Sequence, residues 1–164
     1  MKLSNLDVNQ LKLAVEAEQL RRSLKLYLKH CWGEVINPTI DFMDNWHIDI
    51  LCEYLQAVAN DEIRRLIINI MPRSGKTIIT GACFPTWMWA THPETQFIFA
   101  SYSQRLAEGT NRMRRNIILS DWYQSRWNVE ISKDQKAKNL ITNTANGQYF
   151  ATSITGTCTG VGAD

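Results

Sequence analysis

The stretch IINIMPRSGKTIIT, residues 67–80, decides how the rest of the chain is interpreted. It begins within the apolar run Leu66-Ile67-Ile68, which lacks polar alternation, as is typical of a strand covered on both faces. A turn containing Gly75 and Lys76 follows, and the apolar residues after Thr77 indicate the start of a helix. This order is that of a phosphate-binding loop, G-x-x-x-x-G-K-[ST], except that Ile70 stands where the first glycine is expected.

The residues that hold a phosphate are present despite that departure. Gly75 lets the backbone approach an anion closely, and the amides of 75–77 open a helix whose positive dipole end attracts one. Lys76 supplies a charge to the outer phosphates, the Thr77 hydroxyl is a Mg²⁺ ligand in such loops, and Pro72 fixes the turn. The alternative is a chance occurrence of the short G-K-[ST] motif. We predict a nucleotide site made by Pro72, Arg73, Ser74, Gly75, Lys76 and Thr77.

Arg73, inside this loop, has two open interpretations. Its guanidinium has the chemistry to contact a γ-phosphate, as an arginine finger supplied by the same chain does. It has equally the chemistry of a salt bridge that only holds the loop. The spacing does not separate the two roles.

The composition describes an ordinary globular chain. Its 164 residues are 45% hydrophobic and 21% charged, and a net charge of +2 is too small to indicate nucleic-acid binding by itself. No apolar run is long enough to span a bilayer. The cysteines form no CxxC pair, which favours reduced thiols over a zinc site or disulfides; they are Cys31, Cys52, Cys83 and Cys158.

Periodicity and turn signals predict alternating helices and strands. Helices are expected over 8–32, 45–60, 76–90, 104–120 and 121–127. Strands are expected over 64–71 and 96–102, with a hairpin over 140–144 and 148–152 as an insertion or edge feature. Strand–helix–strand–helix order is typical of an α/β fold, a parallel sheet with covering helices.

Three stretches together resemble the large subunit of tailed-bacteriophage terminases. They are NWHIDILCEYLQAVANDEIRRLIINIMPRSGKT (45–77), FPTWMWATHPETQFIFASYSQRLAEGTNRMRRNIILSDWY (84–123) and ATSITGTCTGVGAD (151–164). The resemblance covers roughly residues 40–164, and the three stretches occur in the order and at the spacing expected for the family. It implies a P-loop NTPase of the additional-strand class that hydrolyses ATP with Mg²⁺ to drive viral DNA into a procapsid.

The resemblance also implies roles for single residues. Lys76 and Thr77 match the phosphate and Mg²⁺ residues, and Arg73 matches a loop arginine used near the γ-phosphate. His47 lies in the segment where adenine is often held, but an ordinary core histidine is an equally open interpretation. Trp46 beside it is expected to be a packing residue.

The chain departs from the family at its end. In the family the tail motif leads into an acidic (Walker B) strand and then a nuclease domain, whereas this sequence stops at Asp164. We therefore expect residues 1–44 to be an N-terminal helical segment and connector, and residues 45–164 to be an incomplete ATPase domain that binds nucleotide without turnover. An open sheet that exposes Phe97, Phe99 and Ile68 is a further expectation.

The partners that the resemblance implies are double-stranded DNA, the portal protein, the small terminase subunit and further copies in a ring, in the cytoplasm of a bacterial host and without a membrane. Basic side chains that are either DNA contacts or solvated surface are Arg105, Arg112, Arg114, Arg115, Lys133, Lys136 and Lys138. Two other functions stay open: another P-loop enzyme, such as a helicase-like ATPase, and a non-catalytic interaction fragment whose helix 8–32 docks a partner.

Overall fold

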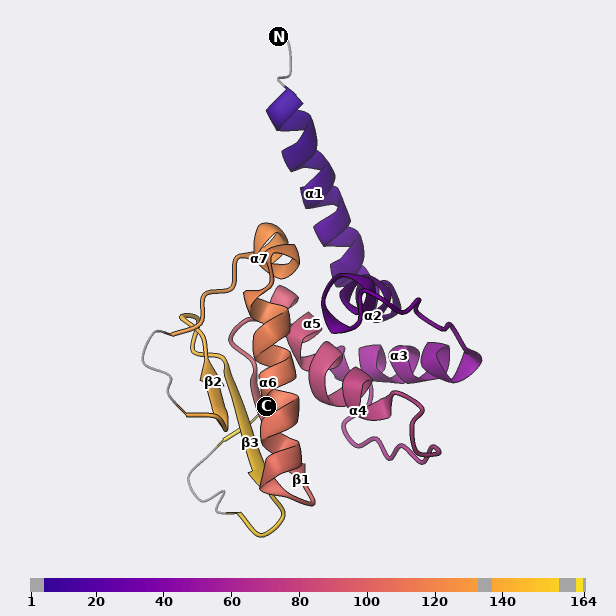
Figure 1. The fold of residues 1–164 in the computed structure, drawn as a ribbon, viewed down its shortest axis with the longest axis vertical. Helices are drawn as coiled ribbons and strands as arrows, with labels where there is room; N and C mark the ends of the chain where they lie inside the picture. The colour runs from indigo at the N-terminus through magenta and orange to yellow at the C-terminus, as the bar shows by residue number, and fades with distance from the viewer. Residues whose placement is uncertain (1–4, 133–136, 157–161, 164) are drawn as a thin grey trace.

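The computed structural model describes residues 5–132, 137–156 and 162–163. It shows a small mixed sheet on one side of the molecule and a group of helices on the other, with the N-terminal helix projecting away from the body (Figure 1). Within the described residues, no helix combines the length and the apolar character that crossing a membrane requires.

The N-terminal region forms two helices where the sequence predicted one. They are α1 (Asn5–Arg22) and α2 (Leu24–Cys31). Ser23 separates them with extended backbone (φ −138°, ψ 108°), and its hydroxyl accepts a hydrogen bond of 3.2 Å from the amide of Leu26. A serine in this position satisfies an amide left free at a helix start, so it begins a new helix inside an apolar spacing that looks continuous.

A π-helical turn, η1 (Trp32–Ile36), leads into an irregular connector over 37–45. The next helix, α3 (Trp46–Ala59), begins directly after Asn45, as the sequence predicted. It buries Ile48, Leu51, Cys52 and Leu55.

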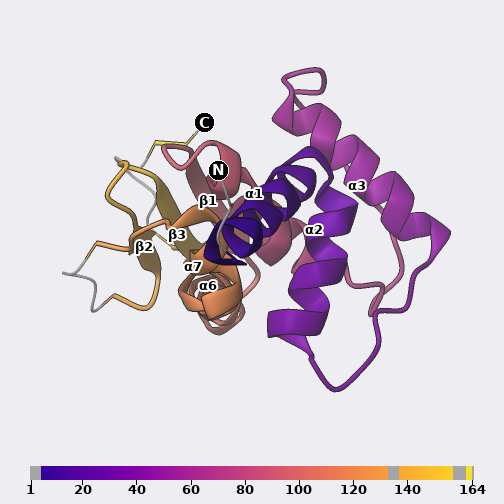
Figure 2. The same cartoon turned by 90° about the horizontal axis from the view of Figure 1, so that it is seen from above.

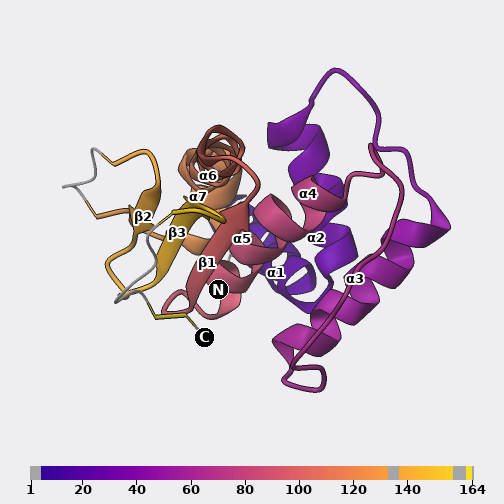
Figure 3. The same cartoon turned by 90° about the horizontal axis from the view of Figure 1, so that it is seen from below.

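The predicted strand over 64–71 is extended but is not part of the sheet. Leu66, Ile68 and Ile70 pack half-buried against the core, while Ile67 between them is 86% exposed. Within the described residues this segment makes no backbone–backbone hydrogen bond, and Figure 3 shows it running beside α3, apart from the sheet. The strand prediction is therefore wrong, because an apolar run favours extended backbone but a strand also requires a paired neighbour.

The helix predicted over 76–90 is continuous from 76 to 91 but changes its hydrogen-bond pattern. Its parts are α4 (Lys76–Ile78), the π-helical η2 (Ile79–Cys83) and α5 (Phe84–Thr91). Pro85 has no N–H to offer the carbonyl of Gly81 four residues earlier. The side chain of Arg114 donates to that carbonyl from Nε instead.

The sheet has three strands in the order β1-β3-β2. β1 (Gln96–Ser101) is parallel to β3 (Gln148–Ser153), and β2 (Leu140–Thr142) is antiparallel to β3. The strand predicted over 96–102 and the hairpin are confirmed, but the hairpin is more than an edge feature, since β3 is the central strand. The sheet is accordingly mixed, with one parallel pair, where the sequence predicted a parallel sheet.

Two further helices match their predictions, α6 (Gln104–Leu119) and α7 (Asp121–Trp127). Ser103 and Ser120 cap them by accepting hydrogen bonds from Leu106 and Tyr123 amides. Viewed from above, α6 lies between the sheet and the α2–α3 helices (Figure 2).

One hydrophobic cluster joins the helices to the sheet. At its sheet side, Trp89 stacks on Tyr149 with ring centroids 3.7 Å apart. At its helical side, the buried Tyr27 hydroxyl donates to Thr86 Oγ1 at 2.8 Å. Free, buried thiols agree with the reduced cysteines that the sequence predicted; these are Cys31, Cys52 and Cys83, whereas Cys158 lies outside the described residues.

Candidate phosphate-binding site

The loop between the extended segment and the helix has an unusual backbone. Arg73 and Gly75 both have positive φ, 64° and 79°, and Ser74 lies between them. Glycine adopts this conformation freely, but for an arginine it costs about 1 kcal/mol. Strain of this kind is concentrated at functional sites, and turns of such geometry direct successive amides into an anion-binding concavity.

Gly75 is also the residue that precedes the helix. No side chain among the described residues caps this helix start, and the first helical backbone bond runs from Ile79 N to Gly75 O at 3.0 Å. The amides of the first turn consequently lack partners within the helix. They form a donor group suited to an anion.

Ser74 connects the loop to α3. Its carbonyl oxygen accepts a hydrogen bond from His47 Nε2 at 3.2 Å. Its hydroxyl oxygen is buried and, among the described residues, has no hydrogen-bond partner. A buried polar atom without a partner is costly, and a phosphate oxygen would satisfy it once the hydroxyl turns toward the pocket that Ser74 lines. Ser74 is therefore a candidate phosphate contact.

Lys76 folds back across the loop, with Nζ 3.5 Å from the carbonyl oxygen of Met71. Thr77 is exposed, so its hydroxyl is accessible as the predicted Mg²⁺ ligand. Among the described residues no group of three His, Cys, Asp or Glu side chains is placed to hold a metal. Mg²⁺ in such sites is bound by one or two carboxylates together with substrate phosphates, so a group of three is not required, and the pocket lining offers Thr77 and Asp41.

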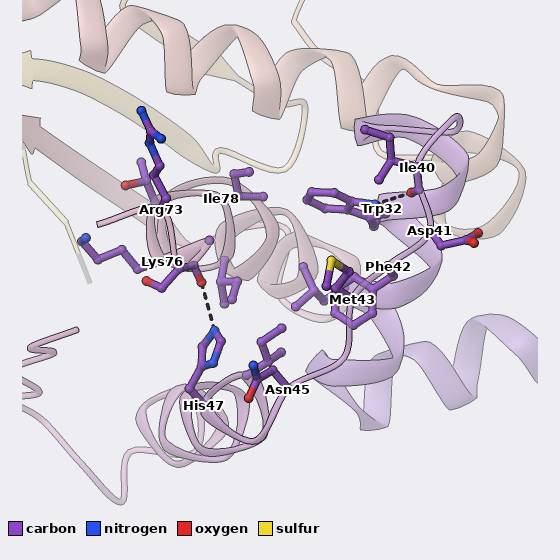
Figure 4. Close-up of a pocket in the computed structure, with 16 residues that line it drawn as sticks. Trp32, Ile40, Asp41, Phe42, Met43, Asn45, His47, Arg73, Lys76 and Ile78 are labelled. Carbon is purple, nitrogen blue, oxygen red and sulfur yellow. Dashed lines mark hydrogen bonds between the residues drawn. The ribbon is translucent and has the colours of Figure 1, made fainter. Parts of the chain in front are cut away.

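A pocket of about 490 Å³ opens beside the loop. It brings together five of the six predicted loop residues and His47; Pro72 does not line it. Figure 4 shows that Arg73 and Lys76 lie at one side with their charged ends diverging, while Trp32, Phe42 and Met43 lie at the other. The pocket thus has a cationic end and an apolar, aromatic end.

The aromatic end was not predicted from the sequence. It comes from η1 and the 37–45 connector, where Trp32 Nε1 donates to the carbonyl of Ile40 at 2.8 Å. Trp32 also meets Phe42 edge-to-face with ring centroids 6.1 Å apart. No motif marks these residues, because their role depends on an irregular connector folding back onto the loop.

The structure changes the interpretation of two residues beside the loop, Trp46 and His47. Trp46 is 71% exposed, so it is not the packing residue that was expected. His47 is half-buried and bonded to the loop carbonyl of Ser74, so it is not a core histidine either. Its position is that of a residue that orients the loop.

The basic residues of α6 divide into two groups. Arg114 is 1% exposed, so it cannot contact DNA, and that candidate was wrong. Three others, Arg105, Arg112 and Arg115, line a hollow of about 440 Å³ together with Glu108 of α6 and with Lys138, which lies outside this helix. Lys133 and Lys136 lie outside the described residues.

Comparison with protein-family models, with curated proteins and with solved structures finds no match to this chain. The resemblance to terminase large subunits rests on the sequence stretches quoted above.

Proposed function

We propose that the chain binds a nucleoside triphosphate, and ATP in particular, through residues 72–77. The observation that carries this proposal is the buried Ser74 hydroxyl, which lacks a hydrogen-bond partner in the described part of the chain, in a loop with positive φ at Arg73 and Gly75 that opens directly into a helix. In the free loop the positive φ values cost conformational strain, and the unpaired hydroxyl costs desolvation energy. Both are offset when an anion lies in the loop.

In this proposal each end of the pocket holds one part of the nucleotide. The amides of 75–77, Ser74 Oγ and Lys76 hold the phosphates, with Thr77 available to Mg²⁺. The Trp32 and Phe42 rings supply an apolar surface for the base. Mg²⁺ would supply charge neutralisation at the phosphates, while His47 keeps the Ser74 peptide in place.

The wider function proposed is that of a DNA-packaging motor ATPase of the terminase large-subunit type. Its support is the sequence resemblance together with the loop geometry. The partners proposed with it are double-stranded DNA, a portal protein, a small terminase subunit and ring neighbours, in the cytoplasm of a bacterial host. The hollow lined by Arg105, Arg112, Arg115 and Lys138 is the surface with the charge to contact a phosphate backbone.

We propose binding without turnover for the described residues. The Asp41 carboxylate lines the pocket, yet Figure 4 shows it directed away from Lys76. A water-activating acid beside the phosphates is the usual requirement for hydrolysis. The competing function, an interaction fragment, is favoured by the α1 surface, where Val8, Leu11 and Val15 are 39%, 62% and 51% exposed.

The test is a titration of a fluorescent ATP analogue against the chain, with and without Mg²⁺. Lys76→Ala removes a charge-assisted contact and is expected to weaken binding by about tenfold to a hundredfold. Lys12→Ala is the matched control, because Lys12 is an exposed lysine on α1 far from the pocket. Equal affinity of the parent and Lys76→Ala would exclude the proposed site.

A further inference from the structure

Helix α6 carries basic side chains on two different faces. Arg105 and Arg112 are exposed and line the hollow described above, which we call the basic hollow. Arg114 of the same helix is 1% exposed, and its Nε donates to the carbonyl of Gly81, in the helix that follows the phosphate loop. Since α6 lies between the sheet and the α2–α3 helices (Figure 2), this one helix connects the two candidate anion sites.

A chain of side-chain hydrogen bonds runs across α6 between these sites. Asn111, which is also 1% exposed, donates from Nδ2 to the carbonyl oxygen of Lys138 at 3.2 Å. Its Oδ1 accepts from Arg114 Nη1 at 3.2 Å. Burial lowers the pKa of Arg114 to about 10, so the guanidinium stays charged at neutral pH and its bonds are charge-assisted. We call Asn111 and Arg114 the polar relay.

The relay ends close to the phosphate loop. Gly81 lies in the π-helical turn η2 of the helix that is continuous from residue 76. Its neighbour Thr80 donates from Oγ1 to the carbonyl of Lys76 at 2.8 Å. A Cβ at Gly81 would lie 3.0 Å from side-chain atoms of Phe99 and Thr110, so this turn is tightly packed. A displacement of the Gly81 peptide therefore also moves the first turn of the helix, which presents the amides of 75–77.

The other end of the relay holds a wall of the basic hollow. Arg115 Nη2 donates to the carbonyls of Ala137 at 3.3 Å and of Leu140 at 3.1 Å, on either side of Lys138. Glu108 is the one carboxylate among the described residues that line the hollow. The basic side chains of the lining repel one another, and a phosphodiester between them would bridge α6 to Lys138. Such a ligand would fix the segment whose carbonyl Asn111 holds.

We propose that a phosphodiester ligand in the basic hollow and a nucleotide at residues 72–77 strengthen each other's binding through Asn111 and Arg114. This inference rests on the proposed nucleotide site. A ligand that orders one end of a paired polar network lowers the ordering cost that the second ligand meets. The effect is reciprocal, so each ligand changes the affinity for the other by the same factor. Asn111 and Arg114 contact neither ligand and act as positioning residues.

The test is a titration of the fluorescent ATP analogue against the full chain at constant salt, with and without saturating short duplex DNA. We expect the duplex to lower the Kd of the analogue by about fivefold or more. The analogue should lower the Kd of a labelled duplex by the same factor. The ratio of the two Kd values of the analogue is the coupling factor.

Asn111→Leu removes both bonds of Asn111 at similar volume and leaves the basic side chains and the phosphate loop unchanged. Its coupling factor is expected to fall to about one. Tyr123→Phe is the matched control, because it removes a buried bond of 2.9 Å to the carbonyl of Thr86, on the same continuous helix, without touching the relay. Its coupling factor should equal that of the parent.

A second measurement does not depend on a variant. Duplex added to the parent without nucleotide should shift the NMR signal of the Gly81 amide, which lies outside the hollow. If Asn111→Leu does not fold, this shift decides whether the relay transmits, and an unchanged Gly81 signal would exclude it.

The outcomes separate the coupling from the nucleotide site. Analogue binding that a saturating duplex leaves unchanged would overturn the coupling and keep the site, whereas no analogue binding would overturn both. Failure of the duplex to bind would also overturn the coupling. A parental coupling factor in Asn111→Leu would show that the two sites communicate by another route and would exclude the relay.

Discussion

Gly147 allows the closest backbone approach in the hairpin, and replacing it by alanine is expected to destabilise the chain strongly. A Cβ at this position would lie 1.9 Å from the carbonyl oxygen of Pro93, 2.7 Å from Asn143 Nδ2 and 2.9 Å from Trp89 Nε1. The first contact is with backbone, which has little freedom to move. The hairpin must therefore shift away from the loop that precedes β1.

The size of the effect follows from the contacts that such a shift breaks. Asn143 Nδ2 donates to Pro93 O at 2.6 Å, and Trp89 Nε1 donates to Thr95 O at 2.9 Å. Two net hydrogen bonds are worth about 2 kcal/mol, and the overpacking adds about 1–3 kcal/mol. A loss of roughly 3–5 kcal/mol in a chain of this size lowers Tm by about 6–20 °C.

The assay is thermal unfolding followed by circular dichroism, and Gly109→Ala is its matched control. A Cβ at Gly109 would meet nothing within 4 Å, and Gly109 lies inside α6. The same substitution there should raise the free energy of unfolding by about 0.5–1 kcal/mol. A Gly147→Ala variant that melts at or above the Tm of the parent would refute the steric argument.

Three further predictions concern the core and the basic hollow. Burial raises the pKa of the Cys52 thiol from 9.0 to about 12, so the folded chain keeps a proton that the unfolded chain releases. This proton's contribution to the free energy of unfolding is complete below pH 9 and falls as the pH rises toward 12, by about 2 kcal/mol at pH 10.5. Between pH 9 and pH 10.5 the urea midpoint of Cys52→Ala should therefore fall less than that of the parent. Tyr27→Phe removes the 2.8 Å bond to Thr86 and should cost about 1 kcal/mol in urea unfolding. Arg112→Ala should reduce the salt dependence of duplex DNA binding by about one released ion. An unchanged slope of log affinity against log salt concentration, measured by filter binding, would exclude Arg112 as a DNA contact.

The sequence predicts much of the fold where local signals are strong. α3, α6, α7 and β1 follow from apolar periodicity and turn signals. The hairpin was also predicted, but the reason why it requires a glycine was not. Asn146 has the positive φ of 67°, whereas Gly147 does not have one, and glycine is required there because Pro93 approaches from a distant part of the chain. Such a contact leaves no local pattern.

The candidate site, like the fold, could be predicted only in part. Residues 73–77 were predicted because one short motif carries the loop chemistry. The aromatic wall at Trp32 and Phe42 was not, since an irregular connector has no period that would place it against the loop. The 64–71 strand failed for a related reason, because an apolar run specifies extended backbone while its pairing depends on neighbours elsewhere in the chain.

The helix that follows the phosphate loop is anchored to the core through its middle part. Four buried side-chain donors converge on residues 81–86 of that helix, coming from α2, α6, α7 and β3. They are Tyr27 to Thr86 Oγ1, Arg114 to Gly81 O, Tyr123 to Thr86 O and Tyr149 to Pro85 O. Three of their acceptors are main-chain carbonyls of the π-helical turn and of the first turn of α5, where Pro85 disrupts the regular pattern. The exposed loop thus starts a helix whose orientation is fixed by the core, so the geometry around Lys76 depends on side chains that never contact the pocket.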